Sequence, residues 1–209
     1  MTPLPPHIYL GLDLGQRHDP AAIALLARLH EIAPGFDPVT WEPHREFHLY
    51  LLHVERIPLA TPYLRIVDRV ADFLRSASLE HLASTLGPFA FGAPHRTLVV
   101  DASGVGAPVV ELFRKARLTA TLAPITITSG TAAHSDHATG GALVPRRDLL
   151  TALRILLEKR RLSIPTRLHD RAALLAEITR LTDQPTTQHD DLAIATALAA
   201  WQSTRGIHL

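Results

Sequence analysis

Two short apolar segments, residues 7–15 and 96–104, each carry an aspartate near their end, followed within three residues by a glycine. The apolar residues before each aspartate have the length and the branched side chains of a buried strand, and the glycines mark the turns that end it. A carboxylate at the end of a buried strand costs free energy unless it is paired or bound to a cation. Asp13 and Asp101 therefore restrict the chain to folds that give both strand ends a polar or charged partner.

Two further strands are predicted after the first of these segments. Residues 21–30 and 46–57 are apolar or partly alternating, with aromatic and branched side chains. Because the connections between these strands and residues 7–15 are short or irregular, the order predicts an antiparallel meander. Residues 31–44 contain three prolines and are predicted to form a loop.

The middle of the chain alternates between helical and strand patterns. A helical stretch begins at Thr61, and the glycines and prolines of residues 87–95 end that region. A predicted helix at 107–116 then separates the strand at 96–104 from another at 121–130. This β-α-β order predicts parallel pairing of the two strands.

The last third of the chain is mostly helical. Residues 129–142, rich in Gly, Ala and His, are predicted to form a mobile loop, and helices are predicted at 145–162, 170–181 and 190–201. The chain shows neither an internal repeat nor a linker. We therefore expect one domain over residues 1–209, with an α/β fold whose mixed sheet has antiparallel first strands and parallel later ones, flanked by helices.

Composition excludes several classes of protein. The 21 basic and 20 acidic residues give a net charge of +1, so a polybasic, histone-like chain is excluded and any contact with nucleic acid must come from local charge. The absence of cysteine excludes disulfides, thiol nucleophiles and cysteine-based metal centres. The chain has no long apolar run and no leader pattern at its start, which predicts a soluble, intracellular protein.

A third acidic position lies at the start of the last predicted helix, where Asp190 and Asp191 are adjacent. Carboxylates from two strand ends and one helix start would suit a pair of hard divalent cations about 3.5–4 Å apart, which can bracket a scissile phosphate. Each acid also has a structural explanation. An aspartate before glycine often bonds the backbone of its own turn, Asp101 would also suit a helix cap, and Asp190 or Asp191 would suit the N-cap of the last helix.

Four segments carry a resemblance to a known family: residues 11–26, 98–116, 144–165 and 189–201. In their order and spacing the chain resembles the C-terminal nuclease domain of phage terminase large subunits, within the ribonuclease H-like superfamily. The resemblance implies a mixed sheet flanked by helices, and a metal-dependent endonuclease that cleaves double-stranded DNA during genome packaging. It also implies that two Mg²⁺ or Mn²⁺ ions are held by four acids: Asp13, Asp101, Asp191 and Asp190.

The resemblance also implies a setting and partners. Double-stranded DNA would be the substrate, and the protein would act in the cytoplasm of a bacterial host, encoded by a phage or prophage and without a membrane partner. A separate ATPase motor, a small terminase subunit or a portal would be its protein partners. Since a complete large subunit carries its motor before the nuclease, the chain would be an excised domain, the product of a split gene or a free-standing relative.

Other polar residues near these segments have two interpretations each. Arg146 and Arg147 precede a predicted helix and would contact DNA phosphates, or would form a solvated helix start. Asp19, before Pro20, is interpreted as a turn residue. His189 is interpreted as an exposed side chain, with assistance to proton transfer as the alternative. A third group would form a metal site only with further ligands: His134, Asp136 and His137.

Three alternatives to a terminase nuclease remain open. A Holliday-junction resolvase of the same superfamily would share the acidic site. A nucleotide-binding enzyme is disfavoured because Val109 stands where a dinucleotide fingerprint has its third glycine, and because the chain has no P-loop. A non-catalytic assembly domain with the same fold is the third alternative.

Overall fold

The structure is a computed structural model that describes residues 6–15, 19–36, 38–39, 41, 43–76, 94–104, 106–137, 140–181 and 189–205. Most of the predicted break at 87–95 lies outside these residues. Within the described part of the chain, no helix is long and apolar enough to cross a membrane. The elements in chain order are β1 (His7–Asp13), β2 (Ala21–Phe36), β3 (Pro43–Ile57), α1 (Tyr63–Arg75), β4 (His95–Asp101), α3 (Gly106–Lys115), β5 (Thr121–Thr128), β6 (His134–Asp136), β7 (Gly141–Pro145), α4 (Arg146–Glu158), β8 (Leu162–Ser163), α5 (Arg171–Arg180) and α6 (Asp191–Thr204).

The described strands form one eight-stranded mixed sheet, in the order β6-β7-β5-β4-β1-β2-β3-β8. Strands β1, β2 and β3 are the predicted antiparallel meander. Strand β4 lies parallel to β1 and to β5, as the β-α-β order predicts, and β5 lies parallel to β7. The predicted α/β fold class, with antiparallel first strands and parallel later ones, is confirmed.

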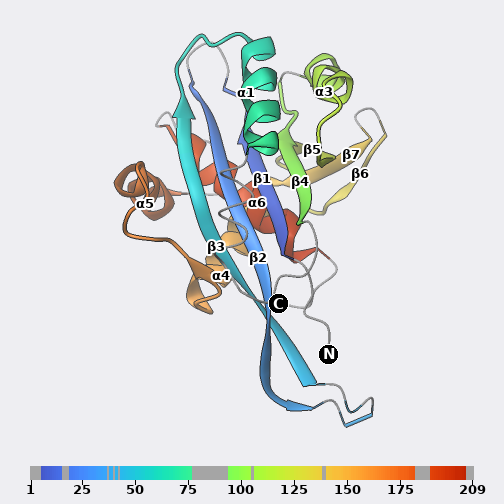
Figure 1. The fold of residues 1–209 in the computed structure, drawn as a ribbon. Coiled ribbons are helices and arrows are strands. Elements are labelled where there is room, and N and C mark those ends of the chain that lie inside the picture. Colours follow the sequence, from blue (N-terminus) through green and yellow to red (C-terminus); the bar gives the residue numbers. More distant parts are fainter. Residues whose placement is uncertain are drawn as a thin grey trace.

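The expectation of a loop at 31–44 is wrong, because β2 and β3 continue into it. Beyond Arg28, which lies opposite His7, β2 pairs with β3 as a two-stranded ribbon that projects past the helices (Figure 1). The register shifts between Ile32 and Phe36, where Pro34 lies. A proline is tolerated at such an irregularity because the ladder hydrogen bond is already interrupted there.

The expectation of a mobile loop at 129–142 is also wrong in part, since β6 and the start of β7 fall within it. Ala142 and Val144 of β7 are buried in the core. A side chain at Gly141 would meet the Pro124 carbonyl oxygen at 1.9 Å, so glycine is required for β7 to pack here. Gly141, which is typical of a loop in the sequence, is thus required by the close packing of a strand.

Helices cover both faces of the sheet, and α6 lies directly on β1. Helices α1 and α3 lie on one face of the sheet and α6 lies on the other (Figure 1). Ile8, Leu10 and Leu12 belong to the core cluster that includes side chains of α1 and α3, whereas Tyr9 belongs to the cluster that includes side chains of α4, α5 and α6. A Cβ at Gly11 would lie only 2.0 Å from the carbonyl oxygen of Ala195 in α6. This contact requires glycine, and it holds α6 against the strand that ends at Asp13.

Candidate metal centre

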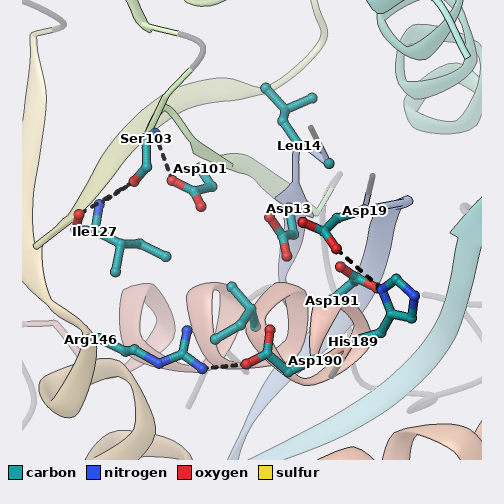
Figure 2. Close-up of a pocket in the computed structure, with 12 residues that line it drawn as sticks. Asp13, Leu14, Asp19, Asp101, Ser103, Ile127, Arg146, His189, Asp190 and Asp191 are labelled. Atoms are coloured by element: carbon teal, nitrogen blue, oxygen red, sulfur yellow. Dashed lines mark hydrogen bonds and ion pairs between the residues drawn. The ribbon is translucent and has the colours of Figure 1, made fainter. Parts of the chain in front are cut away.

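The two strand-end aspartates lie on one face of the sheet, beside the start of α6. Strands β1 and β4 are adjacent and parallel, with Leu12 opposite Val100, so Asp13 and Asp101 end side by side. Alternation along the strands places both on the face that α6 covers. In Figure 2 they point toward Asp190 and Asp191, and the four acids line one pocket of about 270 Å³. Its other lining residues are Leu14, Gly15, Asp19, Ser103, Ile127, Arg146, His189 and Ile194.

Asp101 is held by its own turn. The backbone N–H of Ser103 donates to Asp101 Oδ1 at 2.8 Å, and Ser103 Oγ accepts from the N–H of Ile127 in β5 at 2.7 Å. The turn explanation for this acid is therefore correct, but it does not remove the carboxylate from the pocket. Burial raises the pKa of Asp101 to about 6, although the hydrogen bonds from Ser103 and the charge of Arg146 oppose the shift.

The surroundings of Asp13 disfavour the ionised form of its carboxyl group. Burial, and then the neighbouring charges of Asp101, Asp191 and Asp190, raise the pKa of Asp13 well above its usual range, while Arg146 acts in the opposite direction. A group of carboxylates that raise one another's pKa is stabilised in its ionised form by a cation among them.

The side chains of Asp190 and Asp191 have different partners at the start of α6. Asp190 is the N-cap residue, but its side chain makes no capping hydrogen bond within the described chain and instead forms an ion pair with Arg146. The Asp191 side chain is 6% exposed, and its Oδ2 atom has no hydrogen-bond partner among the described residues. A buried carboxylate oxygen without a donor fits a ligand of a divalent cation.

Two residues that were not predicted as ligands complete a possible coordination set. His189 Nδ1 lies 3.3 Å from Asp19 Oδ1 and 3.8 Å from Asp191 Oδ2. Asp19 lies close to Gly15, just after β1, since a side chain at Gly15 would meet the Asp19 carbonyl oxygen at 2.1 Å. The only sequence signal was that both residues fall within segments that resemble the terminase nuclease.

A partly buried ion pair between Arg56 and Glu177 lies next to Asp191, and no sequence pattern predicts it. Arg56 of β3 contacts the carboxylate of Glu177 in α5, and its Nε lies 3.6 Å from Asp191 Oδ2. Glu177 Oε2 accepts the backbone N–H of Ala193 at 2.9 Å, so this glutamate caps α6. Burial raises the pKa of Glu177, against the hydrogen bond from Ala193 and the charge of Arg56.

The remaining candidate residues lie as follows. Arg146 is the first residue of α4 and faces the pocket, whereas Arg147 is more exposed and donates to the Thr131 carbonyl oxygen. Asp136 accepts a hydrogen bond from Thr126 Oγ1 at 3.1 Å, and His134 and His137 are exposed. These two histidines and Asp136 form no metal-binding cluster in the described part of the chain.

Comparison with known proteins places the fold. Neither a family model nor a curated protein matches the chain. Among solved structures, the large terminase nuclease from the thermophilic phage G20c is similar, with 16% identity and a TM-score of 0.51 over 97% of this chain and 83% of that one. This chain has the fold of a large terminase nuclease. At this identity the likeness concerns the fold, and it agrees with the mixed sheet flanked by helices that the sequence resemblance implies.

Proposed function

We propose that this protein is a metal-dependent endonuclease that cleaves double-stranded DNA by two-metal-ion hydrolysis. The observation that carries the proposal is the convergence of Asp13, Asp101, Asp190 and Asp191 on one pocket at the carboxyl ends of β1 and β4. The likeness of the fold to a large terminase nuclease supports the same chemistry.

The chain's own residues would divide the work of the site. Asp13, between the other acids, would face both ions, Asp101 would face one, and Asp191, with Asp190 as its neighbour or substitute, would face the other. Ser103 fixes the orientation of Asp101, and Arg56, paired with Glu177, lies 3.6 Å from Asp191 Oδ2. When bound, the ions supply an activated water and stabilise the leaving 3′ oxygen, which removes the need for a protein nucleophile.

The basic residues at the start of α4 would position the DNA. Arg146 offsets the charge of Asp190 and would contact the phosphate that enters the pocket, while the exposed Arg147 would contact a neighbouring phosphate. With a net charge of +1, the chain alone would hold DNA weakly. A packaging partner, such as an ATPase motor, a small terminase subunit or a portal in the host cytoplasm, would then deliver the substrate.

Plasmid nicking in Mg²⁺ or Mn²⁺ tests the proposed activity. Asp101→Asn keeps an oxygen acceptor for Ser103 but removes the charge that a metal site needs, so we expect a loss of more than about 100-fold in rate. The matched control is Asp136→Asn, since Asp136 and Asp101 are both 9% exposed but Asp136 lies outside the pocket.

Three results decide the outcome of this assay. Full activity in Asp136→Asn with loss in Asp101→Asn supports the proposal, and equal rates in Asp101→Asn and wild type would contradict it. Cleavage of four-way junctions but not of linear duplex would assign the site to a resolvase instead.

A further inference from the structure

We propose that Asp19, His189 and Asp191 together hold one of the ions through a mixed oxygen and nitrogen donor set, so that this position prefers Mn²⁺ to Mg²⁺. The inference rests on the proposed function, because the ion in question is the one that the proposed function assigns to Asp191. It adds two ligands and a metal preference to that function.

The separations within this set suit a common ion. His189 Nδ1 lies 3.3 Å from Asp19 Oδ1 and 3.8 Å from Asp191 Oδ2, and the three donor atoms lie within 4.8 Å of one another. Two atoms that are each about 2.1 Å from one ion lie about 3 Å apart at a right angle, or about 3.4 Å apart in a tetrahedron. The two separations from His189 Nδ1 are close to these values, and movement of the exposed Asp19 and His189 side chains toward Asp191 would complete the coordination.

Asp191 provides the independent sign that a ligand belongs here. Its side chain is 6% exposed, yet Oδ2 has no hydrogen-bond partner in the described part of the chain. Two side-chain nitrogens lie near this oxygen, Arg56 Nε at 3.6 Å and His189 Nδ1 at 3.8 Å, and both distances are too long for a hydrogen bond. This buried oxygen lies beside Asp19 and His189 (Figure 2) and has no donor at bonding distance, so a metal ion among the three residues would satisfy it.

The chemistry of the donors sets the expected preference. Mg²⁺ takes oxygen ligands and keeps several waters, whereas transition ions accept imidazole nitrogen as well. Asp13, Asp101 and Asp190 offer oxygen alone and would hold either ion. The imidazole of His189 would give the ion position at Asp191 a preference for Mn²⁺ over Mg²⁺.

Electron paramagnetic resonance of the full chain tests this inference directly. Titration with Mn²⁺, followed by displacement with Mg²⁺, gives both affinities, and pulsed measurements detect a ¹⁴N nucleus bound to Mn²⁺. We expect nitrogen coupling in the wild type. In His189→Ala we expect this coupling to vanish and Mn²⁺ binding at one site to weaken by at least about 10-fold, with Mg²⁺ binding changed by less than about 3-fold.

Two further variants sharpen the result. His189→Asp makes the set all-oxygen, so it is expected to lose the preference for Mn²⁺ while it retains Mg²⁺. His137→Ala removes another exposed histidine, from outside the pocket, and is expected to leave both affinities unchanged. An absence of nitrogen coupling in the wild type, or an equal loss of the two ions in His189→Ala, would overturn the inference.

Failure of this inference is distinguishable from failure of the proposed function. If His189→Ala binds Mn²⁺ like the wild type while Asp101→Asn abolishes DNA cleavage, the ligand assignment is wrong and the nuclease assignment stands. If the wild type binds neither ion and cuts no DNA, both are wrong.

Discussion

At the scale of single residues, the acids of the pocket lower the stability of the metal-free fold. The pKa of Asp101 is raised by burial to about 6, whereas an aspartate in an unfolded chain has a pKa of about 3.9. The folded state therefore binds more protons over this range. The stabilisation that protonation of Asp101 gives the folded state is complete below about pH 3.9 and is lost as the pH rises through about 6.

The first prediction concerns Asp101→Asn in the presence of a chelator. At about pH 7.5 this variant is expected to have a higher free energy of unfolding than the wild type, by an amount on the order of 1–3 kcal/mol, and the difference should shrink toward about pH 4.5. Urea denaturation at several pH values measures it. A variant less stable than the wild type at neutral pH would contradict the prediction.

The comparison between variants is needed because other groups titrate in the same range. Burial, with the charges of Arg28 and His95, lowers the pKa of His7 to about 4. The effect of His7 on the free energy of unfolding has the opposite pH dependence. The contribution of His7 to stability is complete above about pH 6.5 and is lost as the pH falls through about 4. The difference between Asp101→Asn and wild type cancels this contribution.

The four acids that line the pocket could be singled out in the sequence as candidates because of where they stand in the strand and helix patterns. Asp13 and Asp101 interrupt apolar strand patterns, and Asp190 with Asp191 begins a helix that is otherwise apolar. Asp19 and His189 could not be recognised as a pair, because they come close to each other and to Asp191 only in the folded chain. Glu177 has an ordinary helical position in the sequence, and only the packing of α5 on α6 buries it.

At the scale of elements, the capping of α6 by a glutamate from α5 links the stability of the helix to the geometry of the site. Glu177 satisfies the Ala193 N–H and pairs with Arg56. Removal of Glu177 leaves the partly buried Arg56 with only the more distant Asp191 carboxylate, and it leaves a helix donor unsatisfied.

The second prediction follows from this pairing. Glu177→Ala is expected to lower the free energy of unfolding by about 3 kcal/mol, and Glu177→Gln by about half as much, because the amide oxygen still accepts the Ala193 N–H. Urea denaturation measures both. Equal losses in the two variants would show that the cap contributes nothing separate from the ion pair.

Sequence patterns predicted most helices and strands but missed the strands within residues 31–44 and 129–142, for the same physical reason. Prolines in 31–44 and small residues in 129–142 are typical of loops, and both segments contain strands. Pro34 falls at a register shift, and Gly141 falls where a strand packs too closely for a side chain. Whether a breaker residue ends a strand depends on its neighbours across the sheet, which the local sequence does not contain.

At the scale of the whole molecule, the topology explains why the site forms where it does. Parallel strands β1 and β4 end together at one edge of the sheet, and close packing at Gly11 brings the start of α6 to the same edge. Ligand sites in open α/β sheets commonly lie beyond the carboxyl ends of the strands. The convergence of the acids therefore follows from the order of the elements.

The most direct test of the central claim is anomalous diffraction from crystals of the full chain soaked in Mn²⁺. We predict two strong anomalous peaks about 3.5–4 Å apart within the pocket, with Asp13 next to both. Two such peaks would match the arrangement that phosphodiester hydrolysis needs. A pocket without Mn²⁺ at saturating concentration, or with ions bound only elsewhere, would contradict it.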